Sequence, residues 1–123
     1  MTLDERTIAK LLAAGRIGVG VGLLALPQAI GGRWVGPDGD RPGTRVLARA
    51  LGVRDLALGA GVMAGLRQDD PVKRWLALGV ICDTVDLIAT AAEPDIPMRG
   101  RLATAVIAGA AALVGVRLVR ALD

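Results

Sequence analysis

Hydrophobic residues along this chain gather into four long apolar segments separated by shorter polar stretches. The segments cover about residues 7–30, 46–66, 73–92 and 101–122. Each is close to the roughly 20 residues that a helix needs to cross the hydrocarbon core of a bilayer. The connections are rich in Gly, Pro and Asp, which favour turns and end helices. The pattern therefore predicts an all-α fold, a four-helix transmembrane bundle.

The connections also predict how the helices are arranged. Short links between long helices favour antiparallel neighbours, so we expect one domain, residues 1–123, in an up-down-up-down bundle with both termini on the same side. Pro27 is expected to bend or end the first helix. Asp70 and Pro71 fit the N-cap and first position of the third helix. Trp34 and Trp75 are expected at opposite faces of the membrane.

Composition supports a membrane protein over a soluble bundle. Hydrophobic residues make up 53% of the chain, yet it has no Phe or Tyr and has 17 Gly. Small residues let helices approach closely in lipid, whereas a soluble bundle of this size normally includes aromatic bulk. A soluble bundle with solvent-facing charges stays open as an alternative. The net charge of +3 comes from scattered cations with almost no aromatic residues, which argues against nucleic-acid binding.

The missing residue types limit the available chemistry. The chain has no His, Ser or Asn, so His-based acid–base chemistry, His metal sites and Ser triads are excluded. Cys82 is the single cysteine, which excludes an intrachain disulfide, and we expect it to be a small buried hydrophobic residue. We expect no metal site and no cofactor.

Charged residues inside the apolar segments are the most informative feature. The first segment contains Arg16, the second contains Arg54 and Asp55, and the third contains Asp83 and Asp86. A helical rise of about 1.5 Å per residue places all five in one central layer of a hydrocarbon core about 30 Å thick. One central Arg or Asp costs about 2.5–3.5 kcal/mol on insertion. The five side chains are therefore expected to face the bundle interior and to pair with one another.

Neighbouring residues extend this interpretation. Asp83 and Asp86 share a helix face because they are three residues apart, and Leu76, Gly79 and Thr90 continue that stripe. The glycines on either side of the charged layer predict close helix crossings. They are Gly15, Gly18, Gly20, Gly22, Gly59, Gly61 and Gly65. The fourth segment has a face of small residues, which is expected to pack inside the bundle or at a subunit contact.

The charged layer leaves two interpretations open. It is a structural ion-pair network that fixes which helices are neighbours, or it is a site for a ligand, proton or ion. Candidate ligand-binding residues are Arg16, Arg54, Asp55, Asp83 and Asp86. Candidate catalytic residues are Asp83, Asp86 and Asp55.

Three functions fit these residues. The first is an interaction or scaffold protein, as a homo-oligomer or a subunit of a larger membrane complex. The second is a transporter or small-ligand-binding protein, in which Arg16 and Arg54 hold an anion and Asp83 and Asp86 take protons or a cation. The third is a membrane enzyme that uses an Asp pair as acid and base on a lipid-like or isoprenoid substrate. The lipid bilayer is the expected partner in each case.

The distribution of cations around the spans predicts orientation only weakly. The side with the termini has Arg6, Lys10, Arg67, Lys73, Arg74, Arg117 and Arg120, and the other has Arg33, Arg41, Arg45, Arg49, Arg99 and Arg101. The excess of one slightly favours cytoplasmic termini in the cell membrane.

Three segments carry a resemblance to a known family. They are Gly15-Arg16 through Pro27 with Trp34-Val35-Gly36, then Leu51 to Gly59, then Asp83-Thr84-Val85-Asp86. With these motifs the chain resembles a family of small four-helix bacterial membrane proteins of unknown function. The layout is more loosely similar to DoxX-like four-helix membrane proteins. The resemblance implies the topology and the charged layer, but no reaction.

Overall fold

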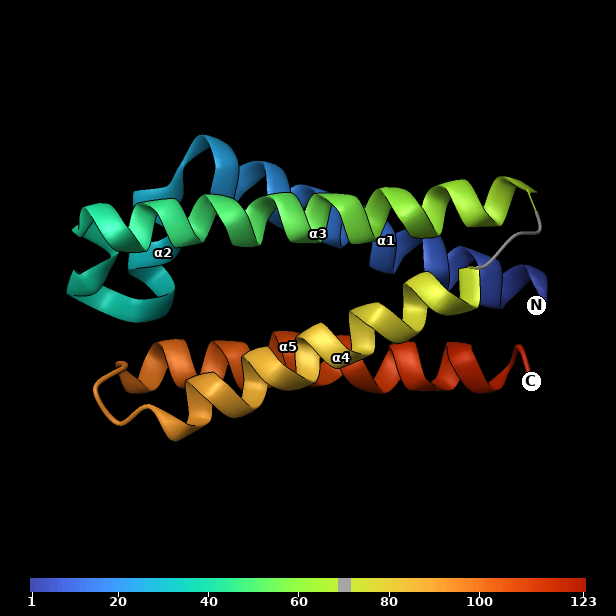
Figure 1. Ribbon diagram of the computed structural model, residues 1–123. Coiled ribbons are helices and arrows are strands. Elements are labelled where there is room, and N and C mark those ends of the chain that lie inside the picture. Colours follow the sequence, from blue (N-terminus) through green and yellow to red (C-terminus); the bar gives the residue numbers. More distant parts are fainter. Residues whose placement is uncertain (69–71) are drawn as a thin grey trace.

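The computed structural model describes residues 1–68 and 72–123, without the side chain of Gln68, and they are almost entirely helical (Figure 1). The order of elements is α1 (Leu3–Ala25), α2 (Pro27–Val35), the short 3₁₀ helix η1 (Gly36–Asp40), α3 (Pro42–Gln68), α4 (Val72–Ala92) and α5 (Met98–Arg120). The prediction of an all-α fold is confirmed. The capping expected from Asp70 and Pro71 lies outside the described residues.

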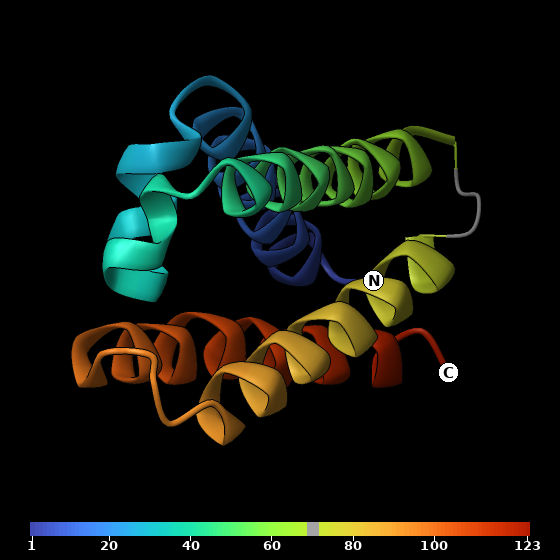
Figure 2. The ribbon, with the colours of Figure 1, turned by 60° about the vertical axis from the view of Figure 1, so that its left-hand side comes forward.

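The four long helices alternate in direction, and both termini lie at the same end (Figure 1). α1 packs closely along α3, and α4 packs along α5. These two pairs form the two layers of the molecule, as both ribbon views show (Figures 1 and 2). Contact between α1 and α5 is sparse. The space between these two helices is where the candidate site lies.

The predicted helix over 7–30 is wrong at both ends. α1 begins at Leu3 because Thr2 and Glu5 form a capping box, in which each side chain binds the backbone N–H of the other residue. It ends at Ala25, because Pro27 has no N–H to continue the hydrogen-bond ladder. The expectation that Pro27 bends or ends the first helix is confirmed.

The predicted connection over 31–45 is also wrong, because most of it is helical. Pro27 opens α2, where its fixed φ suits the first helical position. Gly36 then adopts φ 74°, a left-handed conformation that favours glycine, and η1 follows. α3 begins at Pro42, four residues before its predicted start at 46. The result is a fifth α-helix, α2, across one end of the bundle (Figure 1).

Three helices are long and apolar enough to cross a membrane: α1, α4 and α5. α3 has the length, with 27 residues, but not the composition. Any 18 consecutive residues of α3 contain Arg54 and Asp55 together with at least one of Arg49 and Arg67. The predicted four spans are therefore supported for three helices, and the charges within α3 separate it from the others.

Glycines allow the backbones of α1 and α3 to approach each other closely. A Cβ on Gly20 would lie 2.6 Å from the carbonyl oxygen of Gly52, and a Cβ on Gly52 would lie 2.7 Å from that of Gly20. A Cβ on Gly59 would lie 2.6 Å from the carbonyl oxygen of Ala13. The predicted close crossings are thus present here. The same prediction is wrong for Gly15 and Gly18, where an added Cβ would meet nothing within 4 Å.

The hydrophobic core lies near the termini (Figure 1). Its buried members come from all four long helices and are Ala9, Ala13, Val62, Leu66, Leu76 and Leu118. Trp75 packs on Gly61 at this end, whereas Trp34 hydrogen-bonds Thr90 at the other. The two tryptophans thus lie at opposite ends of the bundle, as predicted.

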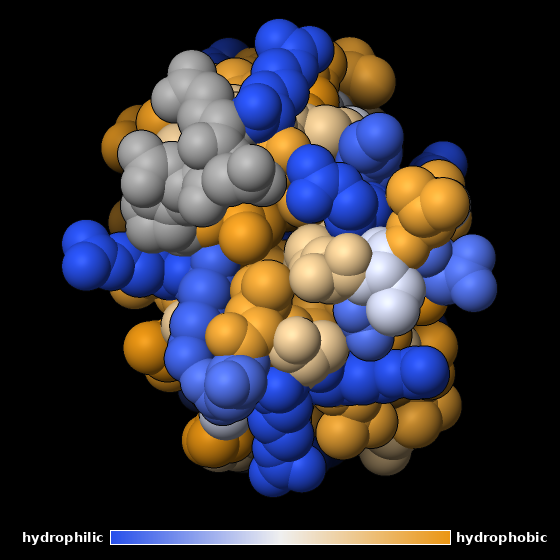
Figure 3. All heavy atoms as spheres, turned by 90° about the vertical axis from the view of Figure 1, so that its right-hand side faces the viewer, coloured by the Kyte–Doolittle hydropathy of each residue, from blue (hydrophilic) through white to orange (hydrophobic). Residues whose placement is uncertain are grey.

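The outer surface has the distribution of a membrane protein. Many large apolar side chains are more than half exposed, among them Leu113 at 74% and Val106 at 69%. Figure 3 looks onto the end with both termini, where hydrophilic side chains gather. Apolar sides with polar ends fit a helical protein that lies in a bilayer.

Candidate functional site

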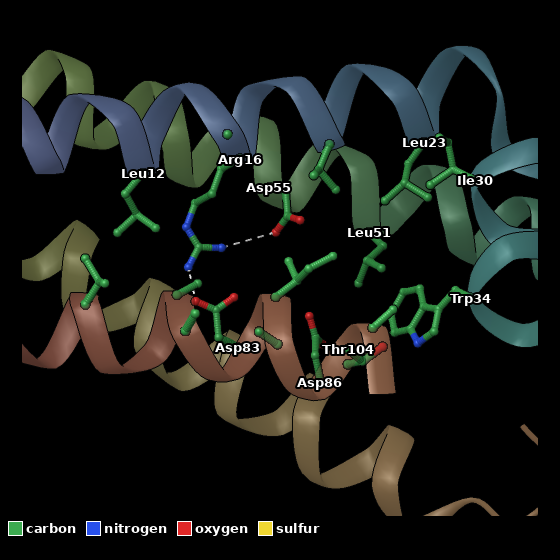
Figure 4. Close-up of a pocket in the computed structure, with 18 of the residues that line it drawn as sticks. Leu12, Arg16, Leu23, Ile30, Trp34, Leu51, Asp55, Asp83, Asp86 and Thr104 are labelled. Atoms are coloured by element: carbon green, nitrogen blue, oxygen red, sulfur yellow. Dashed lines mark hydrogen bonds and ion pairs between the residues drawn. The ribbon is translucent and has the colours of Figure 1, made fainter. Parts of the chain in front are cut away.

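Arg16 is the central residue of the charged layer. It is only 8% exposed, and its guanidinium reaches from α1 toward both α3 and α4 (Figure 4). Its Nη2 donates a short hydrogen bond to Asp83 Oδ2 on α4, and its Nη1 lies 3.6 Å from Asp55 Oδ1 on α3. A single buried cation thus joins three helices.

Arg54 makes the second set of contacts. Its Nη1 lies 3.0 Å from Asp86 Oδ1 and its Nη2 lies 2.5 Å from Asp86 Oδ2, which is a bidentate pair between α3 and α4. Nη2 also lies 3.1 Å from Asp55 Oδ1. The five predicted residues therefore form one continuous network in the order Asp83, Arg16, Asp55, Arg54, Asp86.

Local packing makes room for this network. Gly79 lies one turn before Asp83, and a Cβ there would come within 2.8 Å of Arg16 Nη2. Gly59 lies one turn after Asp55, and a Cβ there would come within 3.3 Å of Arg16 Cβ. The sequence pattern placed Gly79 on the buried stripe of α4, which is confirmed, but did not reveal that it accommodates a guanidinium. Cys82 is half-buried instead of fully buried, because it is turned by about 100° from Asp83 around the helix.

The layer has unequal numbers of opposite charges. Two guanidinium groups and three carboxylates leave one excess negative charge. Both oxygens of Asp86 accept hydrogen bonds, but Oδ2 of Asp55 and Oδ1 of Asp83 make none among the residues that the structure describes. No fully enclosed side-chain nitrogen or oxygen in the described part of the chain is without a partner. These two oxygens are therefore not fully enclosed, and both residues line open space.

That space is a cavity of about 650 Å³ between α1 and α5. Its lining on α1 runs from Ile8 to Leu23, which corresponds to about 22 Å of helix. Most of the wall is apolar, and Arg16, Asp55 and Asp83 lie about midway along it (Figure 4). Pockets that bind small molecules are typically about 300–1,000 Å³, largely apolar, with a few placed polar groups.

α2 closes one end of this cavity. Its residues Ile30, Arg33 and Trp34 belong to the lining. Trp34 Nε1 donates a hydrogen bond of 3.2 Å to Thr90 Oγ1, which ties α2 to α4. A Cβ on Gly100 would collide with the carbonyl oxygen of Trp34, so α5 approaches α2 closely at this point.

The structure brings together all five predicted site residues, but they differ in whether they line the cavity. Arg16, Asp55, Asp83 and Asp86 line the cavity, whereas Arg54 lies behind Asp55 and Asp86 and is absent from the lining. Sequence reasoning missed Arg33, Trp34 and Thr104 as part of the same cavity. On α5, Ala103, Ala108 and Ala111 line the cavity where bulkier side chains would fill it, but the predicted small-residue face included only Ala108 of these three.

Comparison with known proteins adds no assignment. No protein-family model, no curated protein and no solved structure matches this chain. The resemblance to small four-helix bacterial membrane proteins stays an expectation, and the chemistry has to be inferred from the site itself.

Proposed function

We propose that this chain is a multi-pass membrane protein that binds an elongated, lipid-like molecule between α1 and α5. The polar end of the molecule lies at the Arg16–Asp83 pair, and its apolar part lies along the flanking walls. The observation that carries the proposal is the largely apolar cavity beside a buried charged layer.

The cavity favours a binding role for the charged layer over a purely structural role. A network that only fixes helix neighbours needs no open space beside it, and two carboxylate oxygens face such a space. Sparse contact between α1 and α5 would leave a lateral route from the bilayer. A lipid-like ligand fits this route because it partitions into the membrane before it binds.

Catalysis by an Asp pair is the alternative that shares this cavity. General acid–base chemistry needs a carboxyl within about 2.6–3.2 Å of the transferred proton. Asp86 also lines the cavity, but Arg54 engages both of its oxygens, which leaves Asp83 and Asp55 as the lining carboxylates that have one oxygen without a hydrogen bond within the described part of the chain. Both of these carboxylates also pair with Arg16, so binding without reaction is the function that we propose.

We also infer that α3 spans the membrane with the other three long helices. Its 27 residues give a length of about 40 Å, which exceeds the hydrocarbon core of about 30 Å. Arg45 and Arg67 near its ends would reach the headgroups, and Arg54 and Asp55 are paired inside the bundle. α3 then inserts as part of the bundle, with the termini cytoplasmic. A homo-oligomer or larger complex stays a prediction.

Photolabelling in vesicles tests the binding proposal. The probe is a dodecyl alcohol with a diazirine near the end of its chain, added to the purified protein in phosphatidylcholine vesicles. We expect labelled peptides from α1 and α5 to carry the label at residues that line the cavity, such as Leu12, Ala111 and Val114. Mass spectrometry of the digested protein locates the label.

Two alanines of α5 provide a matched pair of variants. Ala111 lines the cavity and Ala105 does not, so Ala111→Phe fills the space whereas Ala105→Phe adds the same bulk on the exposed face. We expect labelling to fall at least about fivefold in Ala111→Phe and to stay within about twofold in Ala105→Phe, since about 1 kcal/mol changes binding fivefold. Equal labelling of outward residues such as Val106 in all three proteins would contradict the proposal.

A further inference from the structure

The two unpaired carboxylate oxygens carry information about the ligand's polar end. Asp83 is 6% exposed and Asp55 is 8% exposed, so both are more than nine-tenths buried. One oxygen of each is used inside the network, by Arg16 for Asp83 and by both arginines for Asp55. The other oxygen of each faces the cavity. A carboxylate oxygen accepts hydrogen bonds and donates none.

We propose that the cavity selects a lipid-like ligand whose polar end donates hydrogen bonds and is neutral or positively charged, as in an alcohol or an amine. This inference rests on the proposed function and names the ligand class that the same site would take. The donor would meet Asp83 Oδ1, with Asp55 Oδ2 on the opposite wall.

The charge balance favours the same class. The network has one excess negative charge, and the surrounding walls are largely apolar, so few polar groups screen it. An anionic head placed there would be repelled by the unbalanced carboxylate, whereas a cationic head would neutralise it. The expectation that Arg16 and Arg54 hold an anion is therefore disfavoured, since carboxylates already occupy both guanidinium groups.

A hydroxyl would fit especially well because it both donates and accepts. Arg16 Nη1 is 3.6 Å from Asp55 Oδ1, an ion-pair distance that is too long for a hydrogen bond. A hydroxyl in the cavity beside Arg16 could accept a hydrogen bond from its Nη1 and donate one to Asp83. Thr104 also lines the cavity and offers a further hydroxyl from α5.

Arg33 is the competing site for an anion. It lines the end of the cavity near α2 and is exposed. An anionic lipid could place its head at Arg33 and its chain beside the charged layer. This arrangement predicts the opposite ligand preference and serves as an outcome of the test.

The test compares probes that share one diazirine-bearing dodecyl chain. The heads are a primary alcohol, a primary amine and a sulfonate, and a fourth probe is the hydrocarbon chain without a head. Labelling of α5 at Ala111 and Val114 is quantified by mass spectrometry in phosphatidylcholine vesicles at pH 7.5. We expect the alcohol and the amine to label at least about tenfold more than the sulfonate, a ratio that corresponds to about 1.4 kcal/mol.

Two variants test whether the carboxylates cause the preference. Asp83→Asn and Asp55→Asn each remove the excess negative charge, so the preference for amine over sulfonate should fall below about threefold. Labelling by the headless probe shows that the cavity is intact in each variant. If neither variant folds, the comparison of the four probes on the natural chain still tests the proposed ligand preference.

The outcomes separate the two proposals. Absence of headless and headed labels from the cavity would overturn the proposed function itself. Cavity labelling with no preference between heads would overturn only the present inference. Stronger labelling by the sulfonate, lost in Arg33→Gln, would overturn it in favour of an anion at the α2 end.

Discussion

At the scale of single residues, the two arginines of the charged layer have different roles. Arg16 is buried in the middle and reaches Asp55 and Asp83, which face the cavity. Arg54 is more exposed and clamps Asp86 by two hydrogen bonds. The pair between Arg54 and Asp86 therefore holds α3 against α4, while Arg16 presents carboxylates to the cavity.

Substitutions of Arg54 and of Asp86 should differ in their effect on folding. Arg54→Leu leaves Asp86 without its bidentate partner and raises the excess negative charge, whereas Asp86→Leu leaves Arg54 paired with Asp55. Removing one partner of a fully buried pair typically costs about 3–5 kcal/mol, and the cost should be smaller here because this pair is partly exposed. We expect Arg54→Leu to lower the folded yield in detergent more than Asp86→Leu, as measured by size-exclusion chromatography.

The exchange variant provides the control for this prediction. Arg54→Asp combined with Asp86→Arg restores an opposite-charge pair between the same two helices and should recover part of the lost yield. If both single variants eluted as monodisperse protein with unchanged yield, the clamp would have no structural role.

At the scale of elements, α1 and α3 form the rigid half of the molecule. Their backbones meet at Gly20 and Gly52, and again at Gly59 and Ala13. This close packing brings Arg16 and Asp55 into the same layer. α5, in contrast, packs mainly on α4 and touches α1 only sparsely. The cavity thus exists because one helix pair is tightly joined and the other contacts it along one side.

Glycines in the Gly-Val-Gly-Val-Gly run of α1 should differ sharply when replaced. Gly20→Ala places a Cβ 2.6 Å from a backbone oxygen of α3, where no flexible side chain can move away. We expect it to lower the unfolding temperature and the folded yield. Gly18→Ala meets nothing within 4 Å and should be neutral or stabilising by up to about 1 kcal/mol, because alanine is the better helix former.

Thermal unfolding in detergent, followed by circular dichroism, measures this difference. The two variants carry the same added methyl group on the same helix, so propensity and hydrophobicity are matched. Equal unfolding temperatures for Gly18→Ala and Gly20→Ala would show that α1 and α3 are farther apart than the structure has them.

At the scale of the whole molecule, the surface inverts the usual arrangement of a soluble protein. Large apolar side chains are exposed along the helices, and charged side chains occupy the ends and the interior layer. Cations are nearly balanced between the two ends, seven against six. The cations that would set the orientation in the membrane thus differ by one between the two ends.

A difference of one cation predicts that two substitutions are enough to change the orientation. The double variant Arg117→Gln, Arg120→Gln leaves five cations at the end with the termini against six at the other, and should invert part of the population. A C-terminal fluorescent-protein fusion reports a cytoplasmic terminus, and an alkaline phosphatase fusion reports the opposite side. We expect phosphatase activity to rise and fluorescence to fall in this variant.

The matched control removes cations from the other end. Arg41→Gln with Arg45→Gln leaves seven against four and should strengthen the proposed cytoplasmic placement of the termini. Fusion proteins that stay in the supernatant after high-speed centrifugation of the lysate would contradict the membrane assignment as a whole. Identical reporter activities in both double variants would contradict only the orientation.

From the sequence alone we predict the helical class, the approximate positions of the long helices and the five charged residues of the central layer. These follow from local properties: apolar length, breakers in the connections, and the cost of placing Arg16 or Asp83 in an apolar helix without a partner. The end of α1 near Pro27 was predictable for the same reason. Over residues 31–45, Gly and Pro suggested a loop, but they instead occupy helix starts and tight contacts in α2, η1 and α3.

Which charges pair, and where space remains, depend on how the helices pack in three dimensions. Pairing depends on how far apart the helices lie, and that distance is set by contacts such as Gly20 with Gly52, which are far apart in sequence. The same packing leaves Arg54 outside the cavity lining and places Trp34 and Thr104 within it. A cavity is the volume that side chains fail to fill between helices, so no local pattern in the sequence specifies it.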